Sequence, residues 1–194
     1  MKFVNFCQNL PDDKHCLQAC LKMAAEYFLP KKFYIKEMDK EISPSEEWAW
    51  FPSGVIWLNN LSLKTKLYSP FDYKEFSEKG EIYLKNFWSQ DIYNYQKANN
   101  CLNDLLFVQK KSQEMVNKNL WENKRINDFE LSVELQSNNC LAIGKTQGHY
   151  MLIIQKDNFG KWEIHDPGTP PIPNRIFNTT IENIFGDILI IKNK

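Results

Sequence analysis

CLQACLKMAAEYF, residues 16–28, is the stretch around which the rest of the chain is organised. Its apolar side chains recur at the three- and four-residue steps of a helix, at Ala19, Met23, Ala24 and Tyr27. Asp12 and Asp13 stand just before it, where the capping residue of a helix is expected, and Leu29-Pro30 would end it. The pattern predicts a helix whose first turn contains Cys16.

Cys16 would therefore lie among backbone N–H groups that have no partner within the helix. Together with the positive end of the helix dipole, these groups stabilise an anion. A thiol in such a place has a pKa of roughly 3.5–7.5 instead of ~8.5, so we expect Cys16 to be partly or largely ionised at neutral pH. The alternative is that Cys16 and Cys20, four residues apart on one helix face, are two small buried hydrophobic residues.

The composition favours a single domain. With 194 residues, 43% of them hydrophobic, the chain can bury one sizeable core. We expect one domain over residues 1–194, with a helical lobe at about 1–137 and a sheet lobe at about 138–194. The 24 Lys and Arg balance the 24 Asp and Glu, and neither sign forms a long run. This balance argues against nucleic acid or a membrane surface as a partner.

The cysteines and the N-terminus indicate a compartment. Five cysteines are an odd number and no CxxC pair occurs, which fits reduced thiols better than disulfides or a four-thiolate zinc site. Residues 1–10 lack the apolar centre of a signal peptide, and no stretch approaches the ~20 apolar residues of a membrane span. We expect a cytoplasmic protein, with no membrane or transporter domain in these 194 residues.

Helix signals dominate the first half of the chain. Residues 31–42 are charged and show no clear period, and residues 63–69 look like a short strand. Residues 48–61 are rich in aromatic side chains and partly helical, with an interruption at Pro52-Ser53-Gly54. The other expected helices begin at Ser43-Pro44-Ser45-Glu46-Glu47 or cover residues 72–78, 81–96 and 101–116.

Strand signals dominate the second half. Asn127-Asp128-Phe129-Glu130 has the residue types of a capping box, and the helix it opens should run to about Ser137, before a turn at Asn138-Asn139. Strands are then expected at 140–144, 149–155, 161–165 and 187–192, with a hairpin turn at 157–160, a stiff loop at Pro167–Pro173 and a short helix at 180–186. The strand 149–155 is almost continuously apolar, so both its faces should be buried. The layout is α+β, with a helical part followed by an antiparallel sheet.

Two chemically reactive side chains converge in this second half. His149 begins the buried strand and Asp166 ends the next one, so the intervening hairpin brings them nearly opposite each other. A carboxylate beside an imidazole fixes the tautomer of the ring, and such an imidazole can deprotonate a thiol. Taken singly, His149 could be a buried core histidine and Asp166 a turn residue. Their occurrence together with Cys16 and Gln8 favours a catalytic site.

These segments resemble a known family. Gln8, then CLQACLKM at residues 16–23, then GHYMLI at 148–153 and HDPG at 165–168 are similar to the motifs of papain-like cysteine peptidases. The closest branch is that of the bacteriocin-processing, double-glycine leader peptidases and their stand-alone relatives. The resemblance covers both ends of the chain in the right order, whereas residues 30–127 match nothing in it. It implies a papain-like fold in which the Cys16 helix packs on the C-terminal antiparallel sheet.

The resemblance also implies a role for each matched residue. Cys16 would be the nucleophile, His149 the general base and later the general acid, Asp166 the residue that orients His149, and Gln8 a donor to the oxyanion. It implies no cofactor and a peptide or amide substrate. The family usually has Asp-Cys-Gly where this chain has His15-Cys16-Leu17.

Several alternatives stay open at this point. The same acyl-thioester chemistry would serve an amidase, a deamidase or an acyltransferase, and a catalytically idle papain-like domain could bind a peptide. Cys20 is a weaker candidate nucleophile, and His15 is expected to be an exposed cap residue. A zinc site from His15, Cys16, Cys20 and His149 or His165 is possible by residue type alone. Pro167–Pro173 and Trp48–Trp57 are the expected walls of a substrate cleft.

Overall fold

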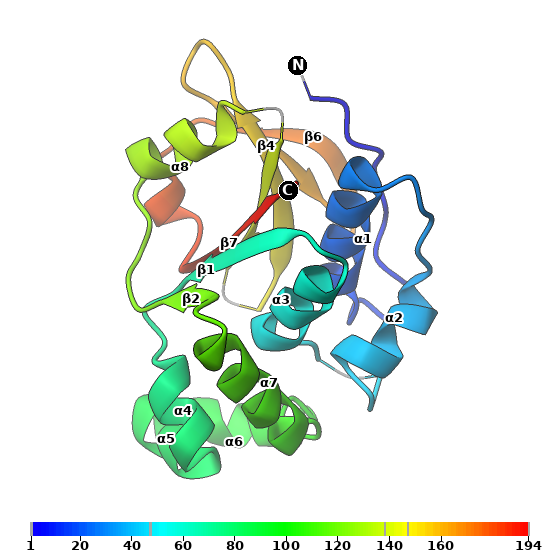
Figure 1. The fold of residues 1–194 in the computed structure, drawn as a ribbon. Coiled ribbons are helices and arrows are strands. Elements are labelled where there is room, and N and C mark those ends of the chain that lie inside the picture. The colour runs from blue at the N-terminus through cyan, green and yellow to red at the C-terminus, as the bar shows by residue number, and fades with distance from the viewer. Residues whose placement is uncertain (1, 47, 138, 147, 194) are drawn as a thin grey trace.

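The computed structural model describes residues 2–46, 48–137, 139–146 and 148–193 (Figure 1). Its helices are α1 (Cys16–Phe28), α2 (Ile35–Ile42), α3 (Phe51–Asn60), α4 (Tyr73–Lys79), α5 (Glu81–Phe87), α6 (Gln90–Ala98), α7 (Leu105–Asn117), α8 (Asp128–Leu135) and the 3-10 helix η1 (Ile181–Asn183). Its strands are β1 (Lys64–Tyr68), β2 (Trp121–Glu122), β3 (Cys140–Lys145), β4 (Tyr150–Lys156), β5 (Trp162–Asp166), β6 (Ile172–Phe177) and β7 (Asp187–Lys192). This α+β content agrees with the expected class.

The strands form one sheet in the order β2-β1-β7-β3-β4-β5-β6. From β1 to β6 every neighbouring pair is antiparallel, and only the short contact of β1 with β2 is parallel. The strand expected at 63–69 is therefore β1, at an interior position of the sheet next to β7. Because β1 and β2 come from the first half of the chain, the sheet is not confined to residues 138–194.

The central strands are buried on both faces. Alternate residues of β3 enter two separate cores: Leu141 and Ile143 lie in one, and Cys140 and Ala142 lie in the other. The same period-two alternation continues in β4 and β7. This pattern confirms that the continuous apolar run of β4 belongs to a strand with two covered faces.

One face of the sheet is covered by α1 and α3. Helix α1 packs on β4 and β3, and its Leu17 and Leu21 are almost wholly buried. Helix α3 approaches α1 closely at Gly54, where a Cβ atom would lie 2.8 Å from a methyl carbon of Leu21. Pro52 stands in the first turn of α3, where its missing N–H costs nothing. Pro52-Ser53-Gly54 is thus part of a helix, and the expected interruption there was wrong.

The opposite face is covered by α8 and η1. Helix α8 begins with a complete capping box, in which the Asn127 side chain accepts from the N–H of Glu130 and the Glu130 carboxylate accepts from the N–H of Asn127. Its Leu131 and Leu135 enter the second core together with Trp162 of β5. The predicted capping box is confirmed.

Helices α4 to α7 follow β1 and precede β2 in the chain. They form an extension that is seen below the sheet in Figure 1. Helix α7 packs on both α3 and α4, which joins the extension to the main body. An aromatic cluster fills the junction, with Trp50 stacked on Phe76 at 5.9 Å between ring centroids. This extension lies within residues 30–127, the part of the chain that resembles no family motif.

Several expected boundaries were wrong. The stretch 31–42 contains α2, the stretch 81–96 is split into α5 and α6, and α7 begins at Leu105 rather than at residue 101. Ser43–Glu46 forms a turn rather than a helix start, the region expected at 180–186 is only the 3-10 helix η1, and β6 begins inside the expected Pro167–Pro173 loop. Glu47, the last residue of that expected helix start, and Asn138, the first residue of the expected turn at Asn138-Asn139, lie outside the described residues.

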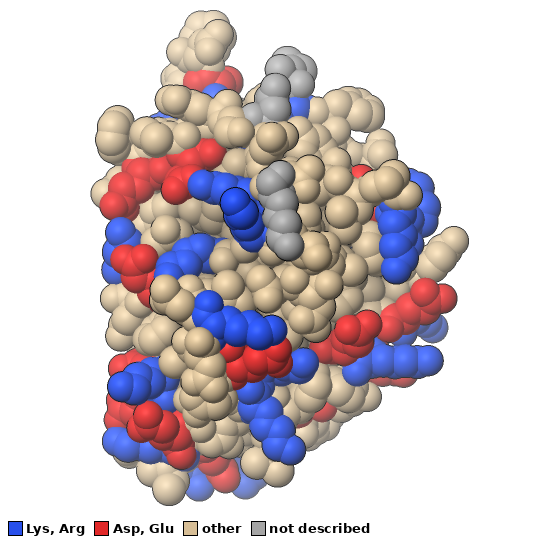
Figure 2. All heavy atoms as spheres, viewed as in Figure 1, with Lys and Arg blue, Asp and Glu red and all other residues tan. Residues whose placement is uncertain are grey.

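The surface mixes both signs of charge. Lys and Arg side chains alternate with Asp and Glu side chains over the face drawn in Figure 2, and several are paired one helical turn apart, as in Lys79–Glu75 and Lys118–Glu114. Within the described ranges, no helix is both long and apolar enough to cross a membrane.

Candidate active site

Cys16, His149 and Asp166 lie at the ends of three elements. Cys16 is the first residue of α1, His149 immediately precedes β4, and Asp166 is the last residue of β5. In the β4–β5 pairing Leu152 lies opposite His165, so the start of β4 and the end of β5 lie side by side. The predicted convergence of His149 and Asp166 follows from this register.

The carboxylate of Asp166 is held by three donors. His149 Nε2 lies 2.7 Å from Oδ1, the backbone N–H of Gly168 donates to the same oxygen at 3.1 Å, and Arg175 Nη1 lies 2.6 Å from Oδ2. Burial alone would raise the pKa of Asp166, but the hydrogen bonds from His149, Gly168 and Arg175 outweigh it and hold this pKa below its ordinary value. Asp166 is therefore an anion beside an imidazole.

Gly168 leaves room for that imidazole. A Cβ atom on residue 168 would lie 3.0 Å from His149 Cε1 and 3.1 Å from both His149 Nε2 and Asp166 Oδ1. Any larger residue would press against the hydrogen-bonded pair. The Asp-Pro-Gly sequence thus has a steric reason for its glycine.

The thiol of Cys16 differs from the expectation. Residue 16 is only 3% exposed, and this burial raises the pKa of the thiol to about 11. The nearby backbone N–H groups of Tyr150, Leu17 and Cys16 favour the anion and lower this pKa, but they do not cancel the effect of burial. The predicted thiolate is therefore wrong for this structure. The prediction considered the helix N-terminus and left out the cost of removing the thiol from water.

The helix that contains the thiol packs on the strand that follows the histidine. Helix α1 contacts β4, whose first residue, Tyr150, comes directly after His149. Cys20, one turn further along α1, is fully buried, and burial together with neighbouring groups raises its pKa well above the ordinary value. Of these two thiols, only Cys16 has the first turn of the helix beside it.

Leu17, which replaces the glycine of the family motif, points into the core. Its side chain is 1% exposed and belongs to the core on the α1 face of the sheet. The substitution therefore fills the interior and adds no side chain to the solvent beside Cys16.

The N-terminal segment is attached to the end of β5 and to the residue after it. Val4 accepts a hydrogen bond from His165 Nε2 at 3.0 Å, and the N–H of Asn9 donates to the carbonyl of Pro167 at 2.9 Å. The Asn9 side chain in turn accepts from the N–H of His15 at 2.9 Å. Gln8 lies between these attachments and is exposed. Asn9, which the sequence did not single out, thus joins the loop before α1 to the end of β5.

His15 is not the exposed cap residue that we expected. It is 3% exposed, and its ring contacts two carboxylates: Nδ1 lies 2.9 Å from Asp12 Oδ1, and Nε2 lies 3.2 Å from Asp39 Oδ2 on α2. The hydrogen bond to Asp39 outweighs burial and raises the pKa of His15. Asp39 also accepts from Gln18 Nε2 at 2.9 Å. His15 therefore joins α1 to α2.

His165 has a third kind of environment. It is buried, and its two ring nitrogens contact the carbonyl of Val4 and the N–H of Asn174. Among the described residues, no three His, Cys, Asp or Glu side chains gather in a way that could hold a metal ion. All five cysteines are free thiols.

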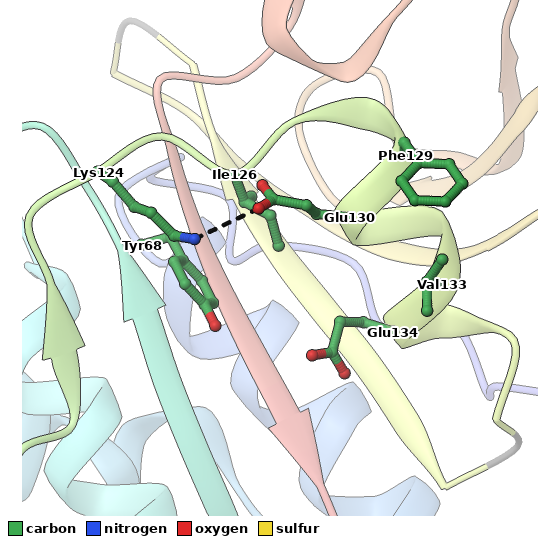
Figure 3. A pocket seen from close by; sticks show the side chains of 7 residues that line it. All are labelled: Tyr68, Lys124, Ile126, Phe129, Glu130, Val133 and Glu134. Atoms are coloured by element: carbon green, nitrogen blue, oxygen red, sulfur yellow. Dashed lines mark hydrogen bonds and ion pairs between the residues drawn. The ribbon is translucent and has the colours of Figure 1, made fainter.

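Two surface hollows lie away from these residues. One of about 250 Å³ is lined by Tyr68 of β1, by Lys124 and Ile126, and by side chains of α8 that Figure 3 labels. The Lys124–Glu130 ion pair spans its rim. A second hollow, of about 140 Å³, lies against α2 and α3. Neither is lined by Cys16, His149 or Asp166.

The aromatic stretch Trp48–Trp57 is packed rather than open. Trp57 is 5% exposed and meets Phe33 edge to face, while Trp50 stacks on Phe76. Ala49 accepts a hydrogen bond from the Tyr150 hydroxyl at 3.3 Å. The rings of Trp50 and Trp57 therefore stabilise the helical side of the molecule. This is a packing role, in place of the expected role as a cleft wall.

Comparisons by sequence identify little. No family model matches the chain. It is 29% identical over 144 residues to the ribosomal protein L11 methyltransferase of Fusobacterium nucleatum, a match that covers 72% of this chain and 44% of that protein. The chain thus spans less than half the length of that curated relative.

Comparisons of structure identify the fold. The chain superposes on the peptidase domain of Streptococcus ComA, a bifunctional ABC transporter involved in quorum sensing, with a TM-score of 0.53 and 10% identity over 99% of this chain and 100% of that one. A double-glycine-motif protease from an AMS/PCAT transporter, solved with its leader peptide, gives a TM-score of 0.49 and 14% identity over 99% and 93%. The chain therefore has the α+β fold of the ComA peptidase domain, the papain-like fold that the sequence motifs predicted.

Proposed function

We propose that the chain is a thiol-dependent hydrolase that cleaves a peptide or isopeptide bond with Cys16, His149 and Asp166. The observation that carries the proposal is the 2.7 Å hydrogen bond between His149 and the buried carboxylate of Asp166, at the start of the strand on which the Cys16 helix packs. A papain-like fold that supplies a thiol, an imidazole and a carboxylate has the parts that acyl transfer needs.

The tautomer of His149 follows from its partner. Because Nε2 contacts Asp166, this nitrogen carries the proton and Nδ1 is left to accept one. In the first step Nδ1 takes the thiol proton while Sγ attacks the amide carbon. The imidazolium then gives that proton to the leaving amine, which departs and leaves a thioester. Water, deprotonated by the same nitrogen, attacks the thioester and releases the acid and the thiol.

The neutral resting thiol suits this general-base route. The pKa of Cys16 lies near 11 because of burial, so the proton leaves in concert with attack on the substrate rather than beforehand. Gln8, exposed on the segment that Asn9 fastens to Pro167, would donate its amide to the oxyanion. One such donor is commonly worth about 3–4 kcal/mol in the transition state.

The substrate class that we propose is a peptide, and peptides that contain Gly-Gly are the first to test. The support is the motif resemblance together with the shared fold. We further propose one papain-like domain over residues 1–194 and a reducing, cytoplasmic setting, which five free cysteines favour. An amidase, deamidase or acyltransferase would use the same first half-reaction and differ in the acceptor.

Methyl transfer, the activity in the name of the curated relative, has no structural support here. Doubly wound parallel sheets are a common site for nucleotide-derived cofactors. In this sheet, every neighbouring pair along the order β1-β7-β3-β4-β5-β6 is antiparallel instead. We therefore do not extend that activity to this chain.

The test is hydrolysis of a peptide library, read by mass spectrometry, with wild type, Cys16→Ala and Cys101→Ala. Cys101 is a matched control because it is a half-buried thiol outside α1. Cys16→Ala should abolish cleavage while keeping the thermal midpoint, and a peptide aldehyde should label only proteins that retain Cys16. Cleavage that persists in a folded Cys16→Ala protein would refute the assignment.

A further inference from the structure

Arg175 lies on the far side of the Asp166 carboxylate from His149. It belongs to β6, the edge strand, where it pairs in register with Ile164 of β5. Its Nη1 is 2.6 Å from Asp166 Oδ2, and its guanidinium carbon lies 4.6 Å from the centroid of the Phe177 ring. An ion pair on one side and an aromatic face on the other fix the guanidinium in one place.

The two oxygens of Asp166 therefore have separate partners. Oδ1 accepts from His149 and from the N–H of Gly168, whereas Oδ2 faces Arg175. A carboxylate that is held at only one oxygen can turn about its χ2 torsion, which is broad for aspartate. Holding both oxygens removes that freedom and keeps Oδ1 aimed at the imidazole.

We propose that Arg175 is a positioning residue for the thiol hydrolase site, which keeps Asp166 ionised and oriented so that His149 presents one nitrogen toward Cys16. This inference rests on the proposed function for its catalytic consequence, but its effect on Asp166 can be measured without any substrate. The side chain of Arg175 is 40% exposed, so it acts through a partly solvated ion pair and its contribution is moderate.

The edge strand is itself tied to the site. The N–H of Asn174, the residue before Arg175, donates to His165 Nδ1 at 3.1 Å, and His165 in turn contacts the N-terminal segment at Val4. The backbone of β6 is thus fixed independently of the Arg175 side chain. Substituting Arg175 should consequently change the carboxylate without releasing the strand.

The experiment compares Arg175→Gln and Arg175→Lys with Arg125→Gln, which changes the only other arginine, an exposed residue outside the site. The carboxyl ¹³C shift of Asp166 is titrated in each protein, with Asp166→Asn to assign the signal. Arg175→Gln should move the midpoint to higher pH, because a positive charge that favours the anion is lost. The midpoint of Arg175→Lys should lie between those of Arg175→Gln and wild type, and Arg125→Gln should have the wild-type midpoint.

Peptide hydrolysis then provides the second measurement. Arg175→Gln should lower kcat/KM about threefold to tenfold, the rate equivalent of one partly exposed ion pair, and should move the acid limb of the pH profile upward. Folded Arg175→Gln and Arg175→Lys proteins that share the wild-type midpoint and rate would overturn the inference. If wild type hydrolyses no peptide, the proposed function fails, whereas the carboxyl titration still decides whether Arg175 controls Asp166.

Discussion

His149 and His15 each contact a carboxylate, and the two contacts differ in almost everything except chemistry. His149 contacts Asp166 at 2.7 Å where β4 begins and β5 ends, and the histidine side chain is 28% exposed there. His15 meets Asp39 at 3.2 Å between α1 and α2, where both side chains are 3% exposed. The first pair is partly open to solvent, and the second is buried between two helices.

The difference teaches that a histidine–aspartate contact does not by itself indicate catalysis. His15 has carboxylates at both ring nitrogens, so neither nitrogen is left to exchange a proton with a substrate. His149 has its carboxylate at Nε2, so Nδ1 would take the thiol proton in the reaction that we propose. What distinguishes the two histidines is how exposed the side chain is and whether the second ring nitrogen also contacts a carboxylate. Both properties depend on packing.

The largest expected effect separates the two histidines directly. His149→Gln should reduce peptide hydrolysis by roughly ten-thousandfold or more, nearly as much as loss of Cys16, because nucleophile and base act as a unit. Asp166→Asn should cost less, since it removes orientation only. His15→Gln should retain most of the activity. Equal losses in both histidine variants, with both proteins folded, would erase the distinction between the two pairs.

The next effect concerns stability. Asp39→Ala should lower the free energy of unfolding by roughly 3 kcal/mol, because it leaves His15 and Gln18 buried without their shared acceptor. Glu41→Ala, an exposed position on the same helix, is the control and should change stability by less than about 0.5 kcal/mol. Urea unfolding measures both. A destabilisation no larger than that of the control would mean that the buried pair contributes nothing to the α1–α2 contact.

The smallest effect is a pH dependence. The pKa of His15 is raised above 6.5, mainly by Asp39, so its protonated form stabilises the fold fully below about pH 6.5 and loses this contribution as the pH rises through the folded pKa. The stability difference between wild type and His15→Gln should therefore be about 1–2 kcal/mol at pH 6 and should shrink toward pH 9. A difference that stays constant or grows with pH would contradict a charged His15.

Local signals sufficed for several parts of this protein. The apolar period of residues 16–28 gives α1, the Asn127–Glu130 motif gives the start of α8, and the hairpin at 157–160 pairs β4 with β5. Because a short turn joins these two strands, the approach of His149 to Asp166 could be predicted before any coordinates, although a bulge at Ile153–Gln155 shifts the register by one residue. Each of these features depends on residues that are close together in the chain.

Features that depend on distant neighbours could not be predicted in this way. The thiol of Cys16 is neutral because the sheet and α1 bury it, and desolvation is a property of the whole packing. The pKa of His15 is raised because Asp39 arrives from α2, and Asp166 is held at both oxygens because Arg175 arrives from β6. The sequence by itself thus determined the papain-like layout and the residues that meet, whereas tertiary structure decided their protonation, since charge depends on which groups and how much water surround each atom.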